Sequence, residues 1–310
     1  MFIERSNVGK KIKYYLATSY RDNGKIRKIR RYLGENLTPV QIKQKKTIAE
    51  KFLKNQLYEV RKQKDPLKYA LNEDELNYIN KLIKTADITN KKLTIKEWQK
   101  FYNSFAYNTN AIEGSRLEQK EVNELFEKEK WPKNKSKEDI AEALGIEEAL
   151  NFCRKTKKHL SIDLIKGLHY IVFKNSKEFA GTLRKENVVV VDGNNTVVHR
   201  GAPPQQLESL LSELVDWYKK NKRKYHSVVL AGIVHNQFEN IHPFADGNGR
   251  VGRLLLNNVL LKHKLPPLII TYEGRGEYYS TLQEFQKQNN LMPTIKFMLK
   301  MYKGTFKEIK

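Results

Sequence analysis

The sequence predicts a mostly helical protein that carries a small α+β appendage at its N-terminus. From Leu93 onward, apolar residues recur at the three- and four-residue spacing of amphipathic or buried helices. One β-branched segment, Val188 to His199, interrupts this pattern, and the first 60 residues differ from it in composition and charge. A chain of 310 residues accommodates one large domain, or one domain with an appendage.

Residues 10–33 are predicted to form a β-hairpin. The β-prone stretch from Lys13 to Tyr20 precedes Asn23-Gly24, a dipeptide typical of tight hairpin turns, and the chain returns from Lys25 to Leu33. Helical spacing then follows over residues 39–60 and 72–84.

The appendage and the core are predicted to meet near residue 65, at Asp65-Pro66, which gives an appendage over residues 1–65 and a core over residues 66–310. Residues 1–60 contain 15 Lys or Arg against 5 Asp or Glu, and the chain as a whole has a net charge of +23. Such a surplus indicates either a surface for nucleic acid or an acidic partner, or lysines spread over every solvated face. The charge alone leaves both interpretations open.

The composition also indicates the cellular compartment in which the protein is expected. No apolar run approaches the roughly 20 residues that span a bilayer, so we expect no membrane association. The first residues are basic but lack the apolar stretch of a signal peptide. Cys153 is the single cysteine, which rules out an internal disulfide and fits a reducing compartment. We therefore expect a cytoplasmic protein.

The core is predicted to be helical apart from one hairpin. Apolar residues fall on one face in four segments, residues 160–173, 205–218, 227–241 and 250–262. Val188 to Val191 and Thr196 to His199 are instead β-prone, with a turn cluster between them. Because a two-stranded hairpin alone is marginally stable, its presence in a helical core suggests a use.

The segment from His242 to Arg253 has the composition of an anion site. Pro243 disfavours helical geometry in His242, so the preceding helix is expected to end there. Gly247 and Gly249 let backbone amides turn inward, and a new helix, expected to open with Arg250, adds unpaired N–H groups. Arg250 and Arg253 are expected in its first turn, on nearly the same side.

The side chains of this segment suggest phosphoryl or nucleotidyl transfer. Guanidinium groups suit phosphate oxygens, and arginine in the first turn of a helix opposes the helix dipole. Asp246 offers an oxygen ligand for Mg²⁺, and His242 is the one group here that accepts a proton near neutral pH. Each residue alone has an ordinary structural explanation, as a helix end or a cap, but the whole run in this order does not.

The run His242-Pro-Phe-Ala-Asp-Gly-Asn-Gly-Arg250-Val-Gly-Arg253 resembles the signature of the Fic family at every defined position, and the resemblance extends over about residues 100–303. It implies the Fic fold, a helical bundle with a β-hairpin flap, and the transfer of AMP from ATP to a protein hydroxyl. His242 would deprotonate the hydroxyl, and Asp246 would hold Mg²⁺ on the phosphates. The nucleotide would be bound by Gly247, Asn248, Gly249, Arg250 and Arg253.

The resemblance also implies a docking element and a transfer type. Residues 184–200 correspond to the flap, whose strand residues Val188, Val189 and Val190 would pair with an extended segment of the target. Arg184 is expected to have a structural, ion-pairing role. Gly249 favours nucleotidyl transfer, since a kinase branch of the family has Lys there.

Thr109 to Gly114 resembles the inhibitory pattern of one Fic branch, in which a helix precedes the core motif. The helix would lie near residues 97–114, and Glu113 would pair with Arg253 and occupy the γ-phosphate position. The alternative is an ordinary helix end with Gly114 as its cap. Tyr279 and Gln286 are expected to contact the adenine or ribose, with ordinary helix packing as the alternative for the tyrosine.

These inferences predict an autoinhibited protein adenylyltransferase that uses ATP and Mg²⁺ and docks a protein substrate on its flap. Removal of AMP by the same site is left open, as is a homodimer. Two alternatives remain: a regulatory protein that binds nucleic acid through the basic N-terminus, and a Fic enzyme that transfers another phosphate-containing group.

Overall fold

The computed structural model of the chain describes residues 1–9, 11–22, 25–64, 72–86, 93–191 and 195–309. The chain divides into two compact units, Met1–Asp65 and Pro66–Lys310. The division falls where the composition of the sequence changes, and each unit has a hydrophobic core of its own.

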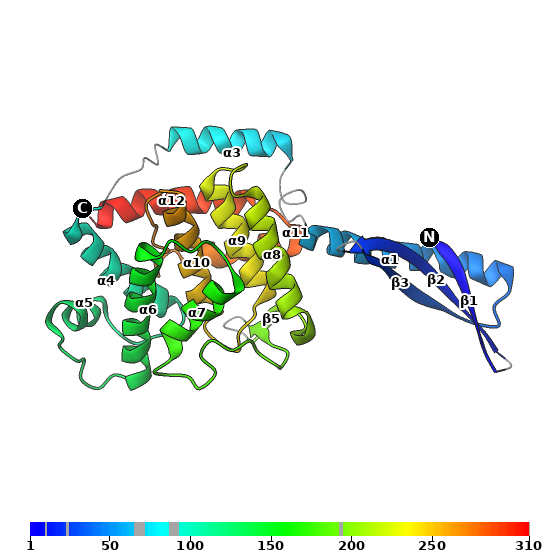
Figure 1. Ribbon diagram of the computed structural model, residues 1–310, viewed down its shortest axis with the longest axis horizontal. Coiled ribbons are helices and arrows are strands. Elements are labelled where there is room, and N and C mark those ends of the chain that lie inside the picture. The colour runs from blue at the N-terminus through cyan, green and yellow to red at the C-terminus, as the bar shows by residue number, and fades with distance from the viewer. Residues whose placement is uncertain (10, 23–24, 65–71, 87–92, 192–194, 310) are drawn as a thin grey trace. The chain divides into compact units, whose positions relative to one another are not determined.

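The first unit is a three-stranded antiparallel sheet packed on one long helix (Figure 1). Its strands, in the order β1-β2-β3, are Phe2–Val8, Lys11–Asp22 and Lys25–Glu35, and the helix α1 is Pro39–Lys64. The predicted hairpin is therefore present as β2 and β3, and β1 adds a strand that the sequence did not predict. Asn23 and Gly24, the predicted turn, lie outside the described residues.

The second unit is helical, as predicted from the sequence. Its helices are α3 Glu73–Thr85, α4 Ile95–Ile112, α5 Gln119–Lys128, α6 Lys137–Lys155, α7 Ile162–Phe173, α8 Leu207–Asn221, α9 Ser227–Ile241, α10 Asn248–Lys262, α11 Arg275–Gln288 and α12 Met292–Glu308. Between α7 and α8 lie the hairpin β4 Val189–Val191 and β5 Val197–Arg200 and the short 3-10 helix η1 Pro204–Gln206. No helix in the described residues is both long and apolar enough to cross a bilayer.

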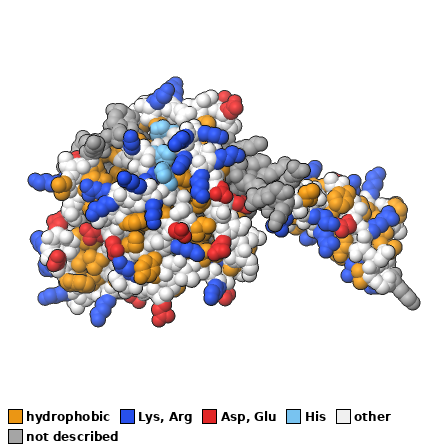
Figure 2. Space-filling model, viewed as in Figure 1, with side chains coloured by type: hydrophobic (Ala, Val, Ile, Leu, Met, Phe, Trp, Pro, Cys, Tyr) orange, Lys and Arg blue, Asp and Glu red, His pale blue; other side chains and the backbone are white. Residues whose placement is uncertain are grey.

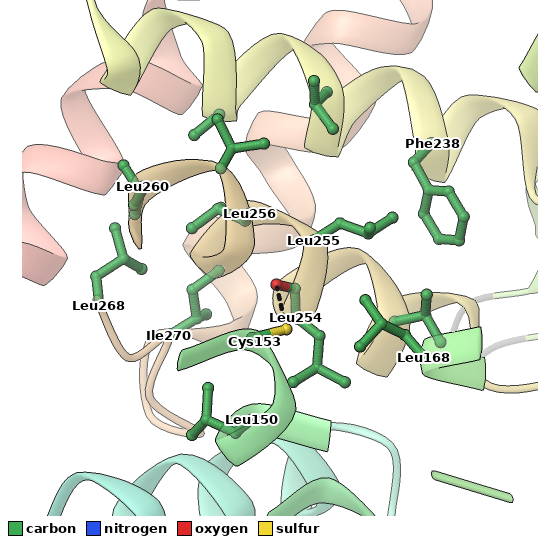
Figure 3. Packing of buried hydrophobic residues seen from close by; sticks show 14 of the residues in the cluster. Leu150, Cys153, Leu168, Phe238, Leu254, Leu255, Leu256, Leu260, Leu268 and Ile270 are labelled. Carbon is green, nitrogen blue, oxygen red and sulfur yellow. Dashed lines mark hydrogen bonds between the residues drawn. The ribbon is translucent and has the colours of Figure 1, made fainter. Parts of the chain in front are cut away.

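The core of the second unit is built around α9 and α10. These helices pack on each other, α9 also packs on α8 and α12, and α10 also packs on α4, α6 and α7 (Figure 1). Figure 3 shows Leu254, Leu255 and Leu256 of α10 directed to different neighbouring elements, because three consecutive apolar residues point to three sides of a helix. The thiol of Cys153 lies in this core, donates weakly to the carbonyl of Leu254 at 3.9 Å, and has its pKa raised to about 12 by burial. Cys153 is therefore a packing residue with an inert thiol.

Candidate active site

The loop between α9 and α10 begins at His242, where α9 ends before Pro243. His242 is the C-terminal cap of α9 and has a positive φ of 53°, while its N–H still bonds to the carbonyl of Phe238 at 2.9 Å. Pro243 prevents the helix from continuing, so the chain leaves the helix axis and carries the imidazole out at the helix end. The left-handed conformation of a non-glycine residue costs energy, and the packing of the loop must offset it.

The loop is held by Phe244 and Asn248. Phe244 is fully buried, and its ring stacks on His169 with centroids 3.8 Å apart. The Asn248 amide accepts the N–H of Phe244 and donates to its carbonyl, both at 2.9 Å. A Cβ at Gly247, where φ is +79°, would overlap the ring of Phe173. Asn248 and Gly247 thus fix the shape of the loop, and the Asn248 side chain does not line the cavity described below.

Helix α10 starts at Asn248, two residues earlier than the sequence predicted, and Gly247 is its N-cap. Arg250 is consequently in the first turn, but Arg253 is in the second. The expectation that both arginines project to the same side is wrong, because each guanidinium binds a carboxylate from a different helix. The partner of Arg250 is Glu142 on α6, and the partner of Arg253 is Glu113 at the end of α4.

Arg250 faces the interior of the protein. Its guanidinium pairs with Glu142, contacts the Asp246 carboxylate at 3.3 Å, and lies over the ring of Phe173 at 4.5 Å. Its side chain is 6% exposed, whereas the carboxylate of Asp246 is 47% exposed. Neither residue lines the cavity described below.

Arg253 is held by the end of α4. Its Nε donates to the Thr109 hydroxyl at 2.6 Å, and its Nη2 donates to the Thr109 carbonyl at 2.9 Å and to Glu113 Oε1 at 2.7 Å. Helix α4 ends at Ile112, Glu113 is its C-cap, and Gly114 follows with a φ of +91°. The sequence left two interpretations of this segment, an ordinary helix end and a glutamate that pairs with Arg253. The structure has both features, since Glu113 ends the helix and also forms the ion pair.

Gly249 allows this pair to form. A Cβ at position 249 would overlap Glu113 Oε1 and lie 3.0 Å from Arg253 Nη1. The carboxylate therefore rests against the first turn of α10, where the unpaired amides and the helix dipole favour an anion. Arg253 Nη1 is buried with no hydrogen-bond partner among the described residues.

A cavity of about 600 Å³ opens beside this ion pair, which is within the usual size range of small-molecule sites. It is lined by the ion pair, by residues at the end of α9, by the hairpin, and by one face of α11. The lining includes Glu113, Gly249, Arg253, Glu239, His242, Val190, Val191, Val198, His199, Tyr278, Tyr279, Leu282, Gln283 and Gln286. Of the residues predicted for the site, those facing the cavity are Glu113, His242, Gly249, Arg253, Val190, Tyr279 and Gln286.

The surroundings of His242 determine its protonation state and its tautomer. Burial, followed by the neighbouring His199, lowers the pKa of His242 to about 4, so the imidazole is neutral at neutral pH. Its Nδ1 lies 3.3 Å from the Glu239 carbonyl, which can only accept a hydrogen bond. Nδ1 therefore carries the proton, and Nε2 has the lone pair that a general base needs.

Sequence reasoning did not assign His199, which belongs to β5. Its Nε2 bonds to the Asn240 carbonyl at 3.0 Å, and its ring meets that of His242 edge-on at a centroid distance of 6.1 Å. Burial lowers its pKa as well. In the sequence, its position at the end of the predicted hairpin was the one feature that could have suggested a role at the site.

Glu239 was also not assigned. It lies one turn before His242 on α9, and its Oε1 is buried without a hydrogen-bond partner in the described part of the chain. Burial, with Glu113 adding to the effect, raises the pKa of Glu239 to about 8, against the opposing charge of Arg253. A neutral carboxyl therefore lines the cavity at neutral pH, and the i, i+3 spacing from His242 could have flagged it.

The hairpin is joined to the α9–α10 loop by Arg184. Its Nε donates to the His242 carbonyl at 2.8 Å, Nη1 donates to Glu186 at 2.7 Å, and Nη2 donates to the carbonyls of Ala202 and Ile241. The expected ion pair of Arg184 is not formed within the described part of the chain, where its hydrogen bonds go to backbone carbonyls. The residue still has a structural role, since it fixes the hairpin base to the loop that carries His242.

The hairpin pairs Val189 with Arg200 and Val190 with His199, and Val189 and Val191 are about half exposed. Val188 precedes the strand and accepts a bond from Gly201 at 3.2 Å. Residues 192–194, in the turn cluster predicted from the sequence, lie outside the described residues. On the opposite wall, the Tyr279 hydroxyl donates to the Ile112 carbonyl at 3.2 Å, which fastens α11 to the end of α4.

Comparison with known proteins places the α9–α10 loop within a known family of domains. The Fic/DOC family model matches residues 159–260, which include His242 and both arginines. The chain is 31% identical over 69% of its length to the protein adenylyltransferase Fic of Nematostella vectensis and 34% identical over 64% of its length to fic-1 of Caenorhabditis briggsae. It covers 49% and 39% of those proteins, so it spans less than half the length of either.

A Fic-domain signaling protein of Bacteroides thetaiotaomicron has a similar fold, with a TM-score of 0.65 and 24% identity over 75% of this chain and 96% of that one. The family match shows that this chain contains a Fic domain, and the structural neighbour shows that the fold is similar.

Proposed function

We propose that this protein is an autoinhibited protein adenylyltransferase that transfers AMP from ATP to a hydroxyl of a protein docked on the β4–β5 hairpin. The observation that carries the proposal is the juxtaposition of three groups in one cavity: the neutral imidazole of His242, the arginine Arg253, and the carboxylate of Glu113 bound to that arginine. The names of the curated relatives support the reaction type.

In this proposal His242 Nε2 takes the proton of the target hydroxyl as its oxygen attacks the α-phosphorus of ATP. A bond forms between that oxygen and phosphorus, the bond from phosphorus to the bridging oxygen breaks, and pyrophosphate leaves. Arg253 would stabilise the negative charge of the leaving phosphates once Glu113 has withdrawn from it. Arg184 keeps His242 in place beside the hairpin on which the target would lie.

Two predicted phosphate contacts take a narrower form here. The side-chain amide of Asn248 already bonds to the backbone of Phe244 through both of its polar atoms. Its contribution would therefore be to hold the loop in shape for phosphate binding, without a direct contact. Arg250 would have to exchange Glu142 for phosphate in order to bind it directly. The amides around Gly247 and Gly249 at the start of α10 supply the remaining anion contacts.

The residues present fit a magnesium ion, because the Asp246 carboxylate is half exposed at the start of α10 and Mg²⁺ is usually held by one or two carboxylates together with phosphates. The described residues contain no cluster of three metal ligands, so the nucleotide itself would have to supply the others. When bound, the ion would neutralise charge on the phosphates.

Autoinhibition follows from competition for Arg253. Glu113 Oε1 accepts a hydrogen bond at one edge of its guanidinium, and the carboxylate rests where a phosphate would approach the first turn of α10. Gly249 supports the autoinhibition, because a Cβ at this position would overlap Glu113 Oε1 and disturb its pair with Arg253.

The test is self-modification followed by mass spectrometry. Glu113→Gly protein incubated with ATP and Mg²⁺ is expected to gain the mass of one or more adenylyl groups, and wild-type protein far less. Addition of His242→Ala to that variant should abolish the gain. An unmodified Glu113→Gly protein would reject the inhibitory role, and a gain of phosphate mass alone would reject adenylyl transfer.

A further inference from the structure

The first unit presents an uncovered sheet face. Tyr14, Leu16 and Leu33 point to the side of the sheet that α1 covers, where they pack on Ala49 and Leu53. Residues directly opposite each other on neighbouring strands share a face, and side chains alternate along each strand. The opposite face therefore consists of the alternate positions, and no described element of residues 1–64 covers it. We call this side the open face.

The open face combines basic and aromatic side chains in cross-strand rows. One row is Glu4, Tyr15 and Tyr32, the next is Phe2, Ala17 and Arg30, and a further pair is Ser19 and Lys28. Phe2 and Tyr32 are about half exposed. In Figure 2, Lys and Arg side chains lie among hydrophobic ones over these strands.

The charge of this unit is not balanced by its own carboxylates. Glu4 already binds Lys28 at 3.0 Å, and Glu35 already binds Lys11 at 2.7 Å. Fifteen Lys or Arg face five Asp or Glu in residues 1–60, so a large positive surplus remains after these pairs. Such a surplus on one small unit requires a polyanionic partner or bulk counterions.

Three arginines of the sheet are held in place by stacking on aromatic rings. On the open face, Arg30 lies over the ring of Tyr15 at 4.7 Å, with its Nη1 3.8 Å from Glu4 Oε1. On the side that α1 covers, Arg5 lies over Tyr14 at 5.7 Å and Arg31 lies over Phe52 at 4.4 Å. A guanidinium stacked on a ring keeps its edge donors available and loses less conformational freedom when it binds phosphate or a base edge. Arginines spread on a surface only for solubility would not need such support.

The sheet narrows to a two-stranded ribbon. Strand β1 pairs with β2 only as far as Ala17, whereas β2 and β3 remain paired from residues 18–22 and 25–29. Ile26 on this ribbon is 72% exposed, and Lys28 lies opposite Ser19. A two-stranded ribbon fits the major groove of B-DNA, which is about 12 Å wide, and an apolar side chain there can contact a thymine methyl group.

We propose that the open face and the ribbon of β2 and β3 bind duplex DNA, with the ribbon in the major groove and the flanking basic residues on the phosphates. A single strand fits less well, because it needs free ring faces on which bases can stack. The rings of Tyr15 and Tyr32 are instead 5.3 Å apart at an angle of 53°, and Arg30 covers Tyr15. The proposal does not depend on the transferase activity.

The experiment uses the full chain and a fluorescent 30-base-pair duplex in an anisotropy titration at several salt concentrations. Wild-type protein is expected to bind with an affinity that falls linearly with salt on a log–log scale. The triple variant Arg27→Gln, Lys28→Gln and Arg30→Gln should bind at least tenfold more weakly, and its salt slope should decrease by roughly two to three units, at about 0.9 per lost phosphate contact.

A matched control removes three positive charges from the second unit by Lys220→Gln, Arg223→Gln and Lys224→Gln, which are exposed or partly exposed near the end of α8. It should leave binding nearly unchanged. Ser19→Asp places one negative charge on the ribbon and should also weaken binding, which keeps the test valid if the triple variant fails to fold.

Three results would overturn the proposal: no salt-dependent binding of the duplex by wild-type protein, equal losses in the strand variant and the control, or tighter binding of a single strand or of polyglutamate than of the duplex.

Discussion

Removal of the Glu113 charge should open the proposed nucleotide site, and the contacts of Arg253 indicate the size of the effect. Arg253 is 2% exposed, and Glu113 holds it through one charge-assisted hydrogen bond at 2.7 Å. A phosphate that takes this place must first displace the carboxylate. Hydrogen bonds to charged groups contribute about 1.5–3 kcal/mol, which corresponds to roughly 10- to 150-fold in affinity.

The variant Glu113→Gln retains the shape of the side chain and removes its charge. Calorimetric titration with ATP and Mg²⁺, in a His242→Ala background that blocks turnover, should show tighter binding by that factor. Glu273→Gln is the control, because Glu273 lies exposed in the turn before α11 and does not line the cavity. Equal ATP affinity with and without the Glu113 charge would refute the competition on which the autoinhibition depends.

Three further outcomes follow from the same contacts. Gly249→Ala should destabilise the wild-type protein by about 1–3 kcal/mol, because the added methyl group overlaps Glu113. The same substitution should cost clearly less in Glu113→Gly protein, and thermal unfolding of wild-type protein, the two single variants and the double variant measures this coupling. The transfer rate of Glu113→Gly protein should stay flat from pH 8 to about pH 5.5 and fall only toward pH 4, because the base is active when unprotonated and its pKa is lowered to about 4; a decline centred at pH 6.5 would contradict the buried, neutral His242. Arg184→Lys should lower stability by about 2–4 kcal/mol through lost bonds to carbonyls, whereas the exposed Arg200→Lys on the same hairpin should not; matching melting curves for the two variants would count against the structural role of Arg184.

The sequence predicted the helical core and the break between α9 and α10 well, since both depend on local rules. The period of apolar residues marks the buried face of a helix, and the X-Pro step at His242-Pro243 ends α9 where predicted. The left-handed turn at Gly247 likewise follows from its residue type. These features need no information from distant parts of the chain.

What could not be predicted depends on distant partners. Arg250 faces Glu142, which lies 108 residues away in sequence, so local spacing could not reveal that its guanidinium points inward. Arg184 looks like an ion-pairing residue until the fold brings the carbonyls of Ala202 and Ile241 to it. Strand β1 was missed because Phe2–Val8 mixes charged and apolar residues and becomes a strand only through pairing with β2.

The group that is transferred tests the central claim most directly. Glu113→Gly protein is incubated with ATP labelled at either the α- or the γ-phosphate, and the label retained on denatured protein is counted. We predict retention of the α label, at least tenfold above wild-type protein, with no retention of the γ label. Retention of the γ label, or equal α labelling of the variant and wild-type protein, would contradict an adenylyltransferase held inactive by Glu113.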